Sequence, residues 1–371
     1  MEKIFPRIQN FFVFANFYKC LFVTYDTERN LIVPARKRIQ AVDYGWIGLH
    51  IIQFVCQVIS LGTTESTLPQ LAIGVTLALG YFLALTLRLD LKKDPVVGQI
   101  WNSLAGQGHA SGKAENRERI LFILLAFLFD GILVLSLLTS LLVAALTLFV
   151  PCVPPLLTSL ICRPANSNGY KVRWTYGPVA KMGFAMLEFV QFQVAVTGGI
   201  YYVIYFLTPA ISRLWLDCKA LSESGKSFEN QVISYRRVQI YEKTLNSCIR
   251  DRIFLTLALL GPLFQVVSGF ALIELANTPN YSTLVVCGML YFAMLCLTLA
   301  CFSAAGQVNQ ITVNWITGRR VICKTRVNRK TLKSFVSARI QFGTNFVERL
   351  TPLVVQQFCV QETVSLILMR S

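Results

Sequence analysis

Long apolar runs alternate along the chain with shorter polar segments rich in arginine and lysine. Six of these runs are long enough to cross the hydrocarbon core of a bilayer, which takes about 20 residues of α-helix. They lie at about 42–62, 67–87, 120–150, 183–208, 253–275 and 283–305. A seventh run, 351–371, is long enough as well but is interrupted by glutamines and a glutamate. The pattern predicts an all-α polytopic membrane protein with seven transmembrane helices.

The seven spans are expected to form one membrane domain over about 41–371, because no polar block between them is long enough to fold as a separate globule. Residues 1–40 precede this domain as a basic segment. Its apolar patch, from Phe11 to Val23, is too short to cross a membrane and contains Asn16 and Lys19. We therefore expect a helix that lies in the membrane interface.

The basic residues are distributed very unevenly between alternate loops. Segments 1–40, 88–119, 213–252 and 319–349 hold 30 of the 35 lysines and arginines, and the other side of the membrane holds 5. Basic loops remain in the cytosol under the positive-inside rule. The N-terminus is therefore predicted to be cytosolic, and seven spans then place the C-terminus outside the cell.

Two of the basic segments also have helical periodicity. Apolar residues recur at steps of three and four in 228–251 and again in 329–350. Both segments are predicted to be amphipathic cytosolic helices, the first continuing from the fourth span and the second leading into the seventh. They either lie on the membrane surface or pack into a cytosolic platform that ties subunits together.

Composition narrows the class of protein further. Hydrophobic residues make up 54% of the chain and charged residues 15%, against about 25% charged in soluble domains. This excludes a soluble globular protein, and the net charge of +16 then reflects cytosolic loops rather than nucleic-acid binding. The sequence contains no motif of a metalloprotease, serine hydrolase, phosphate-binding loop or dinucleotide-binding loop, and no C-x-x-C pair. We expect neither an enzyme nor a cofactor nor a metal site.

Two features of the predicted outer loops agree with the topology. Cys152 and Cys162 flank a short loop on the outer side, where a disulfide could persist. Spacing alone leaves open whether these two cysteines have the geometry to bond. Asn280 begins the sequence Asn-Tyr-Ser and is a candidate glycosylation site close to the membrane.

Ionisable residues inside the spans are functional candidates, because a charged group in hydrocarbon is costly. Asp130 lies near the middle of the third span, where it either bonds to a neighbouring helix or contributes to a ligand site. Glu188 and Gln191 lie one turn apart on the outer half of the fourth span. They either line an outward-facing polar pocket for a small ligand or make contacts between helices.

The seventh span carries a ladder of polar side chains. Gln357, Gln361 and Ser365 follow one another at four-residue steps and share one helix face. Such faces from several subunits could line a hydrated path that apolar neighbours close by dewetting; alternatively, the amides only hold helices together. The remaining residues of this candidate pore are Val360, Glu362 and Val364.

This layout resembles the arthropod gustatory and odorant receptor superfamily. Gustatory receptors end in Thr-Tyr, five hydrophobic residues and Gln-Phe. Here Thr363-Val364, then SLILM, then Arg370-Ser371 stand at the equivalent place. Thr363 and the hydrophobic run match that signature, whereas Val364, Arg370 and Ser371 depart from it, which is typical of a divergent, gustatory-receptor-like member.

The resemblance implies a chemoreceptor of the plasma membrane, acting in taste as a ligand-gated cation channel. Its subunits would form a tetramer, identical or mixed, whose last helix lines a pore for monovalent or divalent cations. A small-molecule ligand would bind in the outer half of each subunit. Two other classes remain open: a small-solute transporter that uses Asp130 and Glu188, and a G-protein-coupled receptor, which requires the opposite orientation.

Overall fold

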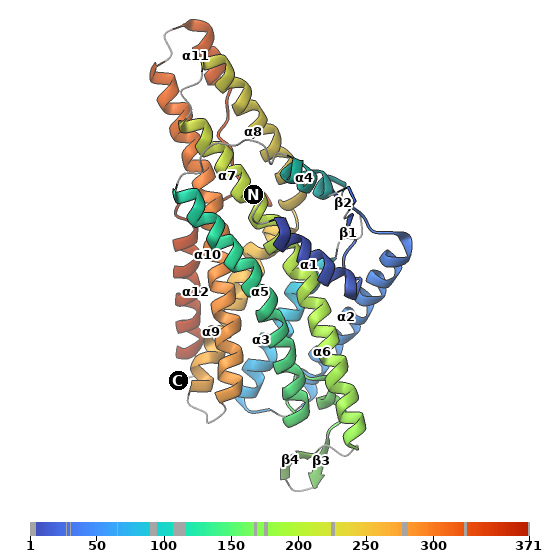
Figure 1. Cartoon of the computed structure of the whole chain (residues 1–371). Helices are drawn as coiled ribbons and strands as arrows, with labels where there is room; N and C mark the ends of the chain where they lie inside the picture. Colours follow the sequence, from blue (N-terminus) through green and yellow to red (C-terminus); the bar gives the residue numbers. More distant parts are fainter. Residues whose placement is uncertain are drawn as a thin grey trace.

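The long helices of the chain run side by side along one axis, so the protein is a helical bundle (Figure 1). The structure is a computed structural model that describes residues 5–26, 28–29, 31–64, 66–89, 95–106, 116–166, 169–173, 177–223, 227–276, 281–322 and 325–369. Six helices of this described part are long and apolar enough to cross a membrane. The predicted class, an all-α multi-pass membrane protein, is confirmed.

The helical elements, in chain order, are α1 (Phe5–Tyr18), α2 (Lys37–Thr63), α3 (Leu68–Arg88), α4 (Pro95–Gly106), α5 (Asn116–Phe149), the 3-10 turn η1 (Leu157–Ile161), α6 (Pro178–Ile200), the π-helical turn η2 (Tyr201–Leu207), α7 (Thr208–Glu223), α8 (Phe228–Ile249), α9 (Ile253–Ala276), α10 (Tyr281–Ile322), α11 (Arg326–Lys333) and α12 (Thr351–Leu368). Short antiparallel hairpins pair β1 (Val23–Asp26) with β2 (Leu31–Pro34), β3 (Arg163–Asn166) with β4 (Gly169–Arg173), and β5 (Gln341–Phe342) with β6 (Asn345–Phe346). The β3–β4 hairpin lies at one end of the bundle, and α8 and α11 lie towards the other (Figure 1).

The predicted spans fall on helices whose ends differ from the ends of the apolar runs. The first, second, third, fifth and sixth spans correspond to α2, α3, α5, α9 and α10. Helix α10 continues well past residue 305 to Ile322, since hydropathy marks the apolar part of a helix and not its end. The six membrane-crossing candidates do not include α12, whose glutamines and glutamate make it more polar. That α12 spans the membrane therefore stays a prediction.

The fourth span is the middle of a much longer helix. Helix α6, the π-turn η2 and α7 follow one another without a break, and Pro178–Ser222 is a single membrane-crossing candidate. The π-turn precedes Pro209, which has no N–H to donate, and the Thr208 side chain donates to the Val203 carbonyl oxygen at 3.0 Å. The predicted helix over 228–251 is present as α8, but it does not continue the fourth span: α7 continues that span, and α8 is a separate helix.

The predicted amphipathic helix over 329–350 is wrong beyond Lys333. Helix α11 ends there, and the chain continues in extended form through the β5–β6 hairpin, which turns at Gly343 with a φ of +55°. A helix would bury Val336 and Leu350 with their apolar neighbours, yet these side chains are 67% and 62% exposed. The buried side chains are instead Leu332, Phe335, Ala338, Ile340 and Val347.

Contacts with α8 explain the extended form of this segment. The amide of Asn246 donates to the Arg339 carbonyl oxygen at 2.8 Å and accepts from the Gln341 N–H at 3.1 Å, as a neighbouring strand would. The Tyr235 hydroxyl donates to the Val336 carbonyl oxygen at 2.7 Å. Because a side chain supplies the partners of buried backbone groups, the segment does not need a helix to satisfy them.

Helix α1 covers one side of the bundle with an aromatic face. Phe11 is fully buried and stacks on Tyr205 of η2, with 3.7 Å between ring centroids. The opposite face exposes Val13 and Phe17, at 61% and 79%. The patch predicted to be interfacial is thus helical up to Tyr18, with one face packed on the protein and one apolar face free for lipid.

Candidate functional site

A cavity of about 640 Å³ lies among α3, α5, α6, α9 and α10. This volume is within the range of small-molecule sites, about 300–1,000 Å³. Its wall is almost wholly apolar and includes Leu77, Tyr81, Phe192, Ala195, Phe264 and Met294. Phe127 of α5 and Phe292 of α10 line the cavity while being 78% and 65% exposed. The cavity therefore opens at the apolar surface of the bundle, between these two helices.

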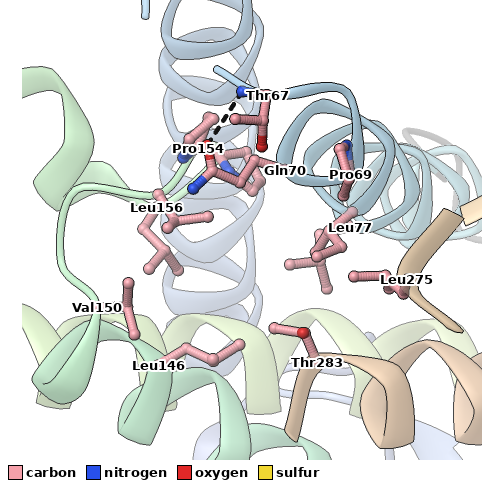
Figure 2. Close-up of a pocket in the computed structure, with 13 residues that line it drawn as sticks. Thr67, Pro69, Gln70, Leu77, Leu146, Val150, Pro154, Leu156, Leu275 and Thr283 are labelled. Carbon is pink, nitrogen blue, oxygen red and sulfur yellow. Dashed lines mark hydrogen bonds between the residues drawn. The ribbon is translucent and has the colours of Figure 1, made fainter. Parts of the chain in front are cut away.

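A second, smaller cavity of about 150 Å³ lies at the end of the bundle that carries the β3–β4 hairpin. Figure 2 shows Thr67 and Gln70 at the start of α3, Val150 and Pro154 in the loop after α5, and Thr283 at the start of α10 around it. Leu77 lines both cavities. The two spaces are thus neighbours, one on each side of this residue.

The loop between α5 and α6 is tied down at several points. Cys152 and Cys162 are joined by a disulfide. Between them, the hydroxyl of Ser159 is hydrogen-bonded to that of Ser60 of α2. The N–H of Leu157 donates to the carboxylate of Glu188 at 2.8 Å. The loop therefore closes one end of the bundle instead of extending into solvent.

Glu188 is buried, at 1% exposure, behind the wall of the larger cavity. Its carboxylate accepts from Gln53 Nε2 at 2.7 Å and from the Tyr81 hydroxyl at 3.5 Å. Neither Glu188 nor Gln191, which is 4% exposed, is among the described residues that line the cavity. The ring of Tyr81 forms part of the cavity wall, so this tyrosine connects the cavity with the polar groups behind it.

Asp130, the third predicted ligand residue, has a different environment. Its carboxylate accepts from Arg7 of α1 at 2.7 Å, and its side chain is 59% exposed. The structure does not bring Asp130 together with Glu188, because the two carboxylates have different partners. The relay that a transporter would build from this pair is not formed by direct contact.

Helix α2 contributes a buried polar stripe that sequence reasoning missed. Its buried face carries Gln40, Asp43, Ile47, His50, Gln53, Gln57 and Ser60, and its exposed face is apolar. The signal was present in the sequence, because these residues recur at steps of three and four. At one end of the stripe, Asp43 forms an ion pair with Arg88 at 2.8 Å, with both side chains 2% exposed. Gly198 of α6 lies directly against the Arg88 side chain.

Helix α12 lies at one edge of the bundle and packs on α9 and α10 (Figure 1). On its packed face, Gln356 Nε2 donates to Gln265 Oε1 at 3.3 Å, and the Cys359 thiol donates to the same oxygen at 3.1 Å. The predicted pore residues Gln357, Val360, Gln361, Glu362 and Val364 are all exposed, and Ser365 is half-buried. A polar ladder therefore points away from the rest of the chain.

Three residues singled out in the sequence, Asn280, Arg370 and Ser371, lie outside the described part of the chain.

Comparison with known proteins identifies the architecture. No protein-family model matches the chain, and no curated protein matches its sequence. Among solved structures, the insect olfactory receptor OR5 from Machilis hrabei in complex with eugenol superimposes with a TM-score of 0.65 and 14% identity, over 100% of this chain and 98% of that one. A second structure of the same receptor gives a TM-score of 0.65 and 14% identity, over 98% of this chain and 97% of that one. The resemblance expected from the sequence is confirmed at the level of architecture: this chain has the fold of an insect olfactory receptor.

Proposed function

We propose that the protein is a chemosensory receptor of the plasma membrane that acts as a ligand-gated cation channel. The observation that carries the proposal is the exposed polar ladder of α12 on a bundle with the fold of an insect olfactory receptor. Glutamine and glutamate side chains facing lipid would cost free energy. Contact with water or with partner subunits removes that cost.

The proposed pore is formed where α12 helices of four subunits face a common axis. Gln357 and Gln361 then supply amide dipoles to passing cations, and Glu362 supplies negative charge. Val360 and Val364 alternate with these polar groups, and they narrow and dewet the path when it is closed. The N-terminus lies in the cytosol and the C-terminus outside in this arrangement, as the distribution of lysine and arginine favours.

The proposed ligand site is the cavity of about 640 Å³. Its wall offers few polar groups, among them the side chains of Tyr81 and Thr76, and the Thr76 hydroxyl already donates to the Ala72 carbonyl oxygen. An uncharged, largely apolar small molecule fits such a wall, because burying a charged one would leave its charge unpaired. The olfactory receptor OR5 with the same fold is known in complex with eugenol. Glu188 acts on such a ligand through the Tyr81 hydroxyl rather than by direct contact.

Cysteine accessibility tests the pore. The protein is expressed in cells in a background that replaces Cys296, an exposed free cysteine in the described part of the chain. Cysteine at Gln357 or Gln361 should react with a water-soluble thiol reagent and change the ligand-evoked current. The matched control is Ile52→Cys on α2, which is 61% exposed on an apolar face and should remain inert. Unreactive cysteines at both glutamines would show that the ladder faces lipid and would reject the pore.

A further inference from the structure

The cavity of about 640 Å³ has an opening in the side of the bundle, between α5 and α10. Phe127 and Gly131 line the cavity from α5, and Phe292 and Cys296 line it from α10. All four residues are also exposed at the surface of the chain. A Cβ atom built at Gly131 would meet nothing within 4 Å, so there is room for a side chain here. We refer to these four residues as the portal.

The neighbours of α5 and α10 explain why an opening lies between them. Helix α5 packs chiefly on α6, whereas α10 packs chiefly on α9 and α7. The two helices are thus held by different partners, and the side chains of Phe127 and Phe292 form the rim between them. Exposed side chains change rotamer within nanoseconds. The rim is therefore a movable barrier, unlike the packed helices behind the cavity.

The surface around the portal is apolar, as expected of a surface in contact with lipid. Helix α5 exposes further apolar side chains before and after the portal, namely those of Ile123, Val134 and Leu138. The portal residues carry no charge, and the carboxylate of Asp130, next to Gly131, is paired with Arg7. The portal therefore suits an uncharged molecule dissolved in the bilayer.

The portal also faces away from the side of the chain that is proposed to meet other subunits. Helix α12 contacts α10 at Thr298, whose hydroxyl accepts from Gln356 Nε2 at 3.4 Å. Because successive residues of an α-helix are rotated by about 100°, Thr298 lies about 120° around α10 from Phe292 and about 160° from Cys296. An assembly formed through α12 would therefore leave the portal open to lipid.

We propose that an uncharged, lipid-soluble ligand enters the cavity sideways from the bilayer, through the portal. This inference rests on the proposed ligand site and adds the route by which that site is reached. An apolar molecule concentrates in the hydrocarbon core, because removing apolar surface from water is favourable. The route also restricts the class of ligand, since a charged molecule is excluded by the cost of entering hydrocarbon.

Water offers a competing route at the end of the bundle. The smaller cavity of about 150 Å³ lies there, lined by Leu156 of the disulfide-closed loop, and Leu77 separates it from the larger cavity (Figure 2). A ligand on this route has to displace Leu77, which is buried in an apolar cluster with Ile73 and Leu275. Close-packed core side chains yield less readily than exposed ones, so we expect the portal to be the faster entrance.

Binding kinetics of tritiated eugenol test the route on the purified chain in lipid nanodiscs, with binding to empty nanodiscs subtracted. Phe127→Ala widens the portal and should raise the association and dissociation rates by the same factor, about threefold or more. The two factors are equal, and Kd changes little, because the substitution lowers the barrier on the path and not the free energy of the bound ligand. Gly131→Trp obstructs the portal and should slow both rates about tenfold.

Two controls separate the portal from other surfaces. Leu138 lies on the same face of α5 as Gly131, two turns later, and is not among the described residues that line the cavity. Leu138→Ala and Leu138→Trp should leave both rates unchanged, and so should Val150→Trp in the smaller cavity (Figure 2). Slower binding in Val150→Trp, with normal rates in Phe127→Ala and Gly131→Trp, would place the entrance at the end of the bundle and overturn the portal.

The proposed ligand site is tested in the same assay by Ala195→Trp. Ala195 belongs to the cavity wall on α6, outside the portal, so a loss of affinity in this variant shows that eugenol occupies the cavity. If affinity falls in Ala195→Trp but the rates do not respond to the portal variants, the route is wrong and the ligand site stands. Absence of eugenol binding, or equal binding by Ala195→Trp, would reject the cavity as the ligand site and the portal with it.

Discussion

Replacing Gly198 by alanine should break the buried ion pair that joins α2 to α3. A Cβ atom at this position would lie 2.5 Å from Arg88 Nε and closer still to Cδ. Carbon and nitrogen atoms do not approach to this distance, so the Arg88 side chain has to move. It is 2% exposed, lies against Gly198 of α6 and holds Asp43 of α2 at 2.8 Å. Movement of the guanidinium therefore separates the two charges.

The expected cost follows from the separated charges. A buried pair that loses one partner destabilises a protein by about 3–5 kcal/mol, because a charge is left without compensation. Alanine gains about 1 kcal/mol over glycine within a helix, which offsets part of this loss. The net destabilisation of Gly198→Ala is therefore about 2–4 kcal/mol by the difference of these two effects.

Thermal unfolding in nanodiscs, together with surface expression, measures this effect. Gly183→Ala on the same helix is the matched control, since nothing lies within 4 Å of a Cβ built there. It should leave stability unchanged or slightly raised. Removing the pair with Asp43→Ala and Arg88→Ala should also cancel most of the added cost of Gly198→Ala. If the Gly198→Ala variant has the same unfolding temperature as the Gly183→Ala variant, the ion pair does not restrain these helices.

Three further changes probe other parts of the structure. Asn246→Ala removes two hydrogen bonds to the extended segment and should cost about 1–3 kcal/mol, seen as faster proteolysis after α11. Ala195→Trp should fill part of the larger cavity and shift a ligand dose–response at least tenfold to higher concentration, with surface expression kept; an unchanged response would place the ligand elsewhere. Cys152→Ser should lower stability by about 2–3 kcal/mol, as expected for a closed loop of this size. A reductant should lower the wild-type unfolding temperature to the same value and leave the variant unaffected.

The membrane helices could be predicted because their signal is local. An apolar run of sufficient length has to be helical in a bilayer, where each backbone polar group needs a partner within the same segment. The failure at 329–350 has the opposite cause. The spacing of Leu332, Val336 and Ile340 fits a helix, but the partners of this segment are side chains of Tyr235 and Asn246, about a hundred residues earlier in the chain. No local pattern contains that information.

The candidate site was only partly predictable for a related reason. The sequence marks Glu188 as a candidate because a carboxyl in an apolar helix is rare. In the structure this carboxyl is buried and hydrogen-bonded. Asp130 lies in an equally apolar helix, yet it pairs with Arg7. Sequence gives the depth of a residue along its helix but not the direction in which the helix is turned. The spacing of the polar residues of α2 predicts that they share one helix face, but only the structure shows that Gln53 donates a hydrogen bond to Glu188.

We expect closure of the extended segment between α11 and α12 to be a late step in the folding of this chain. Its hydrogen bonds join residues 95 to 101 positions apart, and such distant contacts form slowly, because the entropy of the intervening loop is lost first. Gly306 of α10 then receives the backbone of Glu348 so closely that a Cβ would lie 2.7 Å from its carbonyl oxygen. This contact holds the chain at Glu348, just before α12 begins at Thr351. We therefore expect folding to end with the anchoring of the helix that carries the exposed polar ladder.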